Sequence, residues 1–340
     1  MSILKDIVKS IRLGAGREKL CPVCGARLKP VRTLVSGWLT PQSYYCENCG
    51  YVGPIFMDSS QSSLNQRAEP RGSYEGALSL LKIDPEKTAA RITEFIRGTV
   101  SSAGAKGVVV GMSGGVDSSV VASLCVRALG SSSVLALMLR DKPTKESDVR
   151  DAQELAEALG ISHEVIDIGD IADSIASSCK HSSKVDHMVR GNIAARLRMI
   201  LLYMHANIEG FLVAGTGNRS ELLLGYFTKY GDGGVDFLPI GGLYKTQVYQ
   251  LARYLQIPEK IIEKRPSAGL WPGQADEDEL GVSYEVADAI LYCTIDLGLD
   301  AKSTMDLTGA SEQEVSRVLE LVKSSAHKRA MPPTGPLPAR

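Results

Sequence analysis

The chain has 340 residues, of which 44% are hydrophobic and 23% are charged, and these values are ordinary for a globular protein with a large buried core. Its formal net charge of −1 gives no argument for a nucleic-acid or membrane partner. No apolar run approaches the ~20 residues that a membrane-spanning helix needs, and seven cysteines without a regular framework of spacings favour a reducing, cytoplasmic compartment.

The first residues of the chain predict a short helix. Ile3, Ile7 and Ile11 recur at helical spacing, and basic residues occupy the other faces. The segment lacks the apolar core and the small-residue cleavage site of a secretory signal. We therefore expect a structural cap helix instead of a targeting segment.

Two cysteine pairs follow, Cys21-Pro22-Val23-Cys24 and Cys46-Glu47-Asn48-Cys49, each with a glycine directly after it. Glycine permits the tight turn of a metal knuckle, and the 21 residues between the pairs match common structural zinc spacings. Four thiolates would complete a tetrahedron around Zn²⁺ and leave no open position for catalysis. We therefore predict a structural zinc ribbon over residues 1–58, with unmetallated thiols and a redox motif as competing interpretations.

Residues 59–75 have the composition of a linker, because serine, glutamine, asparagine, proline and glycine replace large apolar groups. The main domain, residues 76–340, alternates helical patterns with apolar runs. The predicted order is helix 91–100, strand 106–112, helix 119–129, strand 134–139, helix 148–159, strand 164–168, helix 192–205 and strand 210–214. This alternation predicts an α/β fold with a doubly wound, mostly parallel sheet.

The segment from Gly111 to Ser119 joins a predicted strand to a predicted helix and is rich in glycine and serine. Such a turn suits a phosphate, because glycines allow close approach and free N–H groups point at the anion. It is not a Walker loop, since no Gly-Lys-Ser/Thr follows. Asp117 adds a carboxylate for Mg²⁺. The Ser-Gly-Gly-Val-Asp-Ser pattern resembles the loop of ATP pyrophosphatases, which split ATP into AMP and pyrophosphate; a turn without a ligand is the competing interpretation.

Several long motifs in the second half extend this resemblance. They stand in order at 191–199, 215–221, 225–234, 236–240, 264–271, 274–281 and 327–333. This succession resembles the ammonia-dependent NAD synthetases from Leu78 to Pro333. The cysteine-rich head lies outside the resemblance.

The resemblance implies a Rossmann-like pyrophosphatase fold, a homodimer, and the conversion of deamido-NAD, ATP and ammonia into NAD, AMP and pyrophosphate. Asp117 and Glu221 match the Mg²⁺ ligands, and with Lys229 they are the expected catalytic residues. The positions that match ATP contacts are Gly111, Met112, Ser113, Gly114, Gly115, Val116, Asp117, Ser118, Thr216, Lys245 and Ser267. The positions that match deamido-NAD contacts are Arg196, Lys229, Asp236, His327 and Lys328.

The residue types also suit this chemistry independently. Adenylation of a carboxylate brings two anions together, and Mg²⁺, Lys229 and Lys245 would offset their charge. Positioning can carry most of the catalysis, so no nucleophilic cysteine or serine is required. Arg196 and Arg198 lie two residues apart and point to different helix faces, and we assign the ligand role to Arg196.

Some positions depart from the pattern of the relatives. Leu139-Arg140-Asp141 stands where many relatives have a Leu-Pro pair, so the adenine-side contacts stay unassigned. Gly241-Gly242 replaces a more polar pair, which leaves one phosphate contact open. Gly217-Asn218-Arg219 replaces the Asp-His variant of some bacterial members.

Two other functions compete with this interpretation. A tRNA thiolase with the same loop could use the basic, cysteine-rich head on RNA, but Cys125 lies in the helix after the loop and Cys179 has no CxxC partner. A non-enzymatic nucleic-acid-binding protein would not need Asp117 and Glu221. The sequence has no room for a glutaminase domain, so we expect ammonium and not glutamine to supply the nitrogen.

Overall fold

The structure, a computed structural model, describes residues 19–21, 26–30, 44–48, 52–53, 57–58, 74–178 and 180–335. The chain divides into two compact units. The first takes in the described residues up to Gly76 together with Ile290–Ala310, and the second takes in Ala77–Ala289 and the described residues from Ser311 onward. Among the described helices, none combines the length and the apolar content that crossing a bilayer demands.

In the described part of the second unit, four parallel strands form the sheet. They are β6 (Val108–Gly111), β7 (Val134–Arg140), β8 (Ser162–Asp167) and β9 (Leu212–Ala214), in the order β8-β7-β6-β9. The chain leaves β6 toward β7 and β8 and later returns to the other side of β6 as β9. Such a reversal of strand order opens a ligand crevice beyond the carboxyl ends of the strands.

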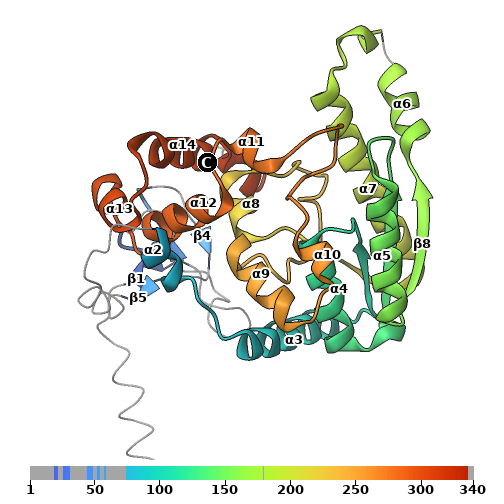
Figure 1. The fold of residues 1–340 in the computed structure, drawn as a ribbon, viewed down its shortest axis with the longest axis horizontal. Coiled ribbons are helices and arrows are strands. Elements are labelled where there is room, and N and C mark those ends of the chain that lie inside the picture. The colour runs from blue at the N-terminus through green and yellow to red at the C-terminus, as the bar shows by residue number, and fades with distance from the viewer. Residues whose placement is uncertain are drawn as a thin grey trace, which may run out of the picture. The chain divides into compact units, whose positions relative to one another are not determined.

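Helices cover both faces of this sheet. Val108 and Val110 of β6 pack into a core shared with α3, α4, α5 and α9, whereas Val109 packs on the opposite side with α6 and α7. The edge strand β8 lies beside α6 and α7 (Figure 1). The prediction of a doubly wound α/β fold is therefore confirmed. These helices are α3 (Pro85–Ser102), α4 (Val116–Leu129), α5 (Glu146–Ala158), α6 (Gly169–Ser177), α7 (His187–Glu209) and α9 (Lys245–Tyr254).

Polar caps make the observed helices longer than the apolar pattern predicts. Asp84 accepts a hydrogen bond from the Lys87 N–H and precedes Pro85, so α3 begins six residues before the predicted position 91. Asp186 caps α7 in the same way, and Gly210 ends it with a φ of +68°. Each predicted element still has its counterpart at the expected place in the chain.

The sequence pattern predicts no helix after β9. The described structure has several there, and the short α8 directly follows β9 at the ligand edge of the sheet. They are α8 (Arg219–Leu224), α10 (Glu259–Ile262), α11 (Asp276–Leu280), α12 (Tyr284–Leu291), α14 (Glu312–Ser324) and α15 (Ala326–Arg329), besides α9.

The first unit contains short antiparallel pairings. β1 (Lys19–Leu20) pairs with β5 (Met57–Asp58), and β3 (Tyr44–Tyr45) pairs with both β2 (Lys29–Pro30) and β4 (Val52–Gly53). A π-helical turn at Tyr292–Asp296 and α13 (Ala301–Thr308) belong to the same unit.

The predicted zinc ligands are only partly within the described residues. Cys21 directly follows β1, Cys46 directly follows β3, and both are buried. Cys24, Cys49, the predicted helix around Ile3, and residues 59–73 of the predicted linker lie outside the described residues. The division between the two units falls within α2 (Tyr74–Leu80), close to the predicted end of the linker.

Candidate active site

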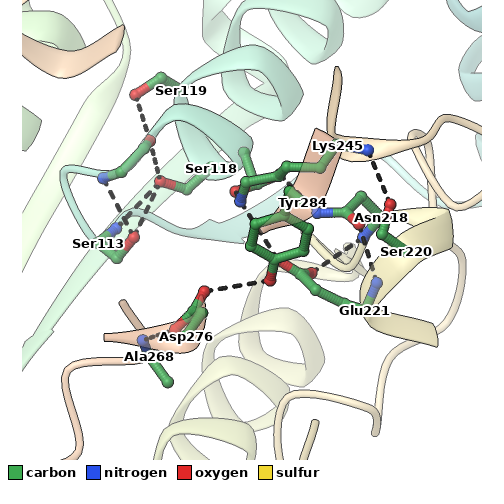
Figure 2. Close-up of polar contacts among 12 residues, drawn as sticks. Ser113, Ser118, Ser119, Asn218, Ser220, Glu221, Lys245, Ala268, Asp276 and Tyr284 are labelled. Atoms are coloured by element: carbon green, nitrogen blue, oxygen red, sulfur yellow. Dashed lines mark hydrogen bonds and ion pairs between the residues drawn. The ribbon is translucent and has the colours of Figure 1, made fainter. Parts of the chain in front are cut away.

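The loop after β6 turns into α4 at the carboxyl edge of the sheet. Ser118 Oγ accepts from the Ser113 N–H (3.2 Å) and donates to Gly115 O (3.1 Å), so the loop closes on its own hydroxyl groups (Figure 2). Gly114 has a φ of +76°, and a Cβ there would lie 2.2 Å from Asp148 O, so only glycine fits. No described side chain caps α4. Its first N–H groups therefore suit an anion.

Two carboxylates and one lysine meet where the strand order reverses. Asp117 lies in the first turn of α4, Glu221 in α8, and Lys245 is the first residue of α9. Lys245 Nζ lies 2.5 Å from Asp117 Oδ2 and 3.4 Å from Glu221 Oε1 (Figure 2). The lysine side chain is only 3% exposed, so a single buried cation is shared between two acids.

The pKa values of these groups reflect this crowding. Burial, and after it the charge of Asp117, raises the pKa of Glu221 to about 8. Burial acts to lower the pKa of Lys245, but Asp117 and Glu221 outweigh it and raise that pKa above its ordinary value. Without a metal ion, one lysine does not keep both acids ionised near neutral pH. The donor set therefore suits a hard divalent cation such as Mg²⁺.

Asn218 connects the two carboxylates and is fully buried. As the N-cap of α8 it accepts from the Glu221 N–H (3.0 Å), and its own backbone N–H donates to Glu221 Oε2 (3.1 Å). Its Nδ2 donates to Asp117 Oδ1 (2.9 Å) (Figure 2). One amide thus orients both acids. The Asn-x-x-Glu spacing is a capping-box signal that the sequence analysis did not use.

The buried Asp288 is linked to Lys245 through hydrogen bonds at the start of α9. Asp288 of α12 accepts hydrogen bonds from Ser220 Oγ and from the Thr246 N–H (2.9 Å). Ser220 Oγ in turn accepts from the Lys245 N–H (2.9 Å) (Figure 2). Burial raises the pKa of Asp288 to about 6. This network fixes the start of α9, and no local sequence signal pointed to Asp288.

A second set of contacts holds the segment before α11 close to Lys245. Asp276, the first residue of α11, accepts from the Ala268 N–H (2.9 Å) and from the Tyr284 hydroxyl (3.2 Å) (Figure 2). The Tyr284 ring centre lies 5.2 Å from Lys245 Nζ. The segment that carries the predicted Ser267 is therefore fastened beside the lysine.

A cleft of about 1050 Å³ lies over these groups. Four separate segments of the chain contribute the predicted ATP contacts, and all of them line it. They are Gly111, Met112, Ser113, Gly114, Gly115, Val116, Asp117, Ser118, Thr216, Lys245 and Ser267. Glu221 and the predicted deamido-NAD residue Lys328 also line the cleft.

The other residues predicted for deamido-NAD do not line this cleft. Lys229 Nζ donates to the backbone oxygens of His327 (2.7 Å) and Ala330 (3.4 Å). The guanidinium of the exposed Arg196 donates to Lys229 O (3.3 Å). Both side chains therefore donate to backbone carbonyl oxygens: Lys229 to those of the C-terminal segment, and Arg196 to that of Lys229.

Asp236 has a structural partner on each carboxylate oxygen. It accepts from the Tyr203 hydroxyl (3.0 Å) and from the Val213 N–H of β9 (2.8 Å). The Asp236 carboxylate thus joins α7 to β9. Lys328 Nζ likewise donates to two backbone oxygens, those of Gly225 (2.7 Å) and Phe227 (2.8 Å).

Arg140 and Asp141, which stand where the sequence leaves the adenine-side contacts unassigned, both form ion pairs. Arg140 pairs with Glu146 (2.6 Å) and with Asp167 (2.8 Å). Asp141 is buried and is gripped by the guanidinium of Arg190. Both contacts stiffen the loop after β7.

Metal-binding groups are limited in the part of the chain that the structure describes. No group of three or more His, Cys, Asp or Glu side chains gathers there in a way that could hold a metal ion. A Mg²⁺ at Asp117 and Glu221 would therefore need phosphate or water oxygens as further ligands. Two of the four predicted zinc ligands are outside the described residues.

Comparisons with known proteins identify a family for this chain. Residues 88–332 match the family model described as NAD synthase. The chain is 54% identical over 255 residues to an NH(3)-dependent NAD(+) synthetase from Hyperthermus butylicus, which covers 75% of this chain and 92% of that protein.

Two solved structures share the fold. An NMN synthetase from Francisella tularensis matches with a TM-score of 0.66 and 36% identity. An NH3-dependent NAD synthetase from Campylobacter jejuni, in complex with nitrate, matches with a TM-score of 0.63 and 32% identity. Each comparison covers 75% of this chain and 100% of the other.

Proposed function

The chain belongs to the NAD synthase family, and we infer that it catalyses the ammonia-dependent conversion of deamido-NAD and ATP into NAD, AMP and pyrophosphate. The observation that carries this inference is the meeting of the 111–118 loop with Asp117, Glu221 and Lys245 in one cleft. The cleft opens at the strand-order reversal, where sheets of this type bind nucleotides.

Mg²⁺ fits the carboxylate pair. Asp117 and Glu221 would hold it, because carboxylate oxygens are the donors it prefers and the two acids lie together beside one lysine. Bound with ATP, the ion would offset negative charge on the phosphate groups.

The residues of the chain bind and orient the reactants. The first N–H groups of α4 suit phosphate oxygens, and Lys245 offsets the charge that grows on the leaving pyrophosphate. An oxygen of the nicotinate carboxylate bonds to the α-phosphorus as the bond to pyrophosphate breaks. Ammonia then bonds to the carboxyl carbon, AMP leaves with the electron pair of the C–O bond, and the new amide nitrogen loses one proton to water.

The test is an end-point measurement of NAD formed from deamido-NAD, ATP and Mg²⁺. We expect NAD with ammonium and none with glutamine as the sole nitrogen source. Because one similar structure is an NMN synthetase, the assay also tests nicotinate mononucleotide in place of deamido-NAD. We expect the protein to convert nicotinate mononucleotide more slowly than deamido-NAD. A folded protein that forms no NAD with ammonium would contradict the proposal.

The thiolase alternative is not favoured. The family match covers residues 88–332, and Cys125 lies in α4, the helix after the loop, with its side chain buried in the core. Burial raises the pKa of the Cys125 thiol to about 12, so it is not a thiolate nucleophile near neutral pH.

We further propose that the protein is a homodimer that uses the outer face of α7. Ile200, Met204 and Ile208 follow one another at four-residue spacing and are 54%, 45% and 71% exposed; we call them the α7 apolar face. Side chains of this kind gain stability when a partner covers them. Arg196 precedes Ile200 by one helical turn on the same face. A partner there would lie close to a residue predicted for deamido-NAD.

We also propose that Cys21, Cys24, Cys46 and Cys49 bind one structural Zn²⁺. The support is the burial of Cys21 and Cys46, each directly after a short strand, together with the paired CxxC spacing. Metal analysis should find one zinc per chain, its loss in Cys46→Ser, and its retention in the control Cys125→Ser. A wild-type protein without zinc would refute this.

A further inference from the structure

Most basic side chains that line the cleft already have acceptors. Lys245 forms ion pairs with Asp117 and Glu221. Lys145 is the exposed lysine of the cleft lining. The cations of the lining other than these two and Arg198 donate hydrogen bonds to groups of the same chain. Their partners are Gly114 O and Asp148 for Lys264, Glu146 and Asp167 for Arg140, Asp278 for Arg265, and the Gly225 and Phe227 oxygens for Lys328.

Arg198 is partly buried, unlike Lys145, and among the described residues it has a single backbone acceptor and no carboxylate partner, unlike the other cations. It lines the cleft from α7, and its Nε donates to Leu139 O at the end of β7 (3.1 Å). No carboxylate of the described chain lies within 4.0 Å of its guanidinium. Its two terminal nitrogens have no acceptor among the described residues, yet neither is among the buried polar atoms left without a partner. They are therefore reached by solvent, and the cavity that Arg198 lines is the cleft.

The charges around Arg198 do not neutralise it. Asp141 is the strongest attractive charge, but it is already gripped by Arg190, whose own charge repels Arg198. Asp232 attracts Arg198 as well and accepts the Thr228 N–H (2.8 Å). Burial lowers the pKa of Arg198. A half-buried cation without an ion pair is costly to the folded chain, and a bound anion would remove that cost.

The position of Arg198 indicates which anion it serves. The strand order is β7-β6-β9, and the phosphate loop follows the middle strand β6. Asp117, Glu221 and Lys245 gather on the β9 side of this loop, whereas Arg198 is anchored to Leu139 at the end of β7. The carboxylate pair suits the metal-bound pyrophosphate end of ATP. Arg198 therefore lies on the side left for the α-phosphate and the attacking carboxylate.

We propose that Arg198 is a catalytic residue that donates its two terminal N–H groups to the oxyanions of the adenylation step. The proposal rests on the proposed function. In that step a nicotinate carboxylate oxygen bonds to the α-phosphorus, and pyrophosphate leaves with the electron pair of the broken P–O bond. Arg198 keeps its protons throughout and offsets the charge of the two reacting anions, for which its planar fork is suited.

The experiment measures pyrophosphate release from Mg·ATP and deamido-NAD without ammonia. We compare wild type, Arg198→Lys, Arg198→Ala and the exposed α3 control Arg91→Gln. We expect Arg198→Ala to lower the rate about 100- to 1000-fold, the range for loss of one preorganised donor. Arg198→Lys should fall between Ala and wild type, because it keeps the charge but loses the fork. Arg91→Gln should match wild type, and Mg·ATP affinity should change little in all variants.

Added guanidinium ion separates a chemical role from a structural one. We expect it to restore part of the rate of Arg198→Ala and to leave Arg91→Gln unchanged. An Arg198→Ala variant with a near wild-type rate would overturn the proposal. So would a loss of rate that guanidinium does not restore, or Ala and Lys variants that both fail to fold. A wild type that forms no NAD with ammonium would instead overturn the proposed function.

Discussion

The two sides of the predicted active site differ in how completely one chain builds them. On the ATP side, Asp117, Asn218, Glu221 and Lys245 come from three helix starts and hydrogen-bond to one another; we call them the carboxylate–lysine cluster. On the other side, Arg196, Lys229, Asp236 and His327 do not line the cleft; we call them the dinucleotide residues.

The difference lies in what each group of side chains binds within the chain. The members of the cluster contact side chains across the strand-order reversal, so their geometry is fixed before any ligand arrives. Lys229 and Arg196 donate to backbone oxygens, which a ligand phosphate could replace. The predicted ATP side is therefore preorganised, whereas we expect the predicted dinucleotide side to be rearranged by its ligand or completed by the proposed partner.

The largest effect should follow from breaking the carboxylate–lysine cluster. We expect Asp117→Ala and Glu221→Ala each to lower adenylation on the order of a thousandfold, because each removes a predicted Mg²⁺ ligand. Both variants should still fold, but the melting temperature should fall, because the buried Lys245 loses one of its two acidic partners. Pyrophosphate release without ammonia measures the step, and the exposed Glu285→Ala is the control. Pyrophosphate release near the wild-type rate by either variant would contradict the assignment of that residue as a Mg²⁺ ligand.

An intermediate effect should follow from Asn218→Ala. The acids remain, but the amide that orients both of them is lost. We expect a rate about 10- to 100-fold lower at fixed Mg²⁺, because the predicted metal ligands lose the group that orients them, with partial recovery at high Mg²⁺. The stability should fall by about 1–3 kcal/mol, because buried polar groups lose their partner. A Mg²⁺ titration of the adenylation rate and a urea unfolding curve measure these two effects, and the exposed Gln313→Ala variant is the control. If the rate and the stability of Asn218→Ala equal those of the control, Asn218 does not orient the two acids.

A smaller and more selective effect should follow from changes among the dinucleotide residues. We expect Lys229→Met to raise the KM for deamido-NAD about tenfold, the effect of one lost charged contact, while the KM for ATP stays the same. Steady-state kinetics with each substrate varied in turn measure this. A parallel rise in both KM values would mean that the two sides are not separable.

Part of this arrangement could be predicted from the sequence. The 111–119 loop was visible because its glycines, hydroxyls and carboxylate are contiguous and follow an apolar strand. The alternation of strands and helices up to residue 214 also gave the fold class, which the structure confirms. Glu221 and Lys245 could be assigned to the site only through the resemblance, because the Asn218–Glu221 spacing predicts a capped helix start and not a metal ligand.

Other parts depend on contacts between distant segments. Asp288 matters because α12 brings it beneath Ser220 and Thr246, and a single acid in a helical pattern carries no such signal. Arg196 and Arg198 were separable by helical phase, but only the fold shows that Arg198 enters the cleft and Arg196 does not. The short helices after β9 have too few residues for a clear period.

The most direct test of the contrast between the two sides is ligand binding by a monomeric variant. Ile200→Glu combined with Ile208→Glu places charges in the α7 apolar face, and sedimentation should show a dimer for wild type and a monomer for the variant. Isothermal titration should then give a Mg·ATP affinity within about threefold of wild type and a strongly weakened affinity for deamido-NAD. A monomer that binds deamido-NAD like wild type, or one that loses Mg·ATP, would contradict the account.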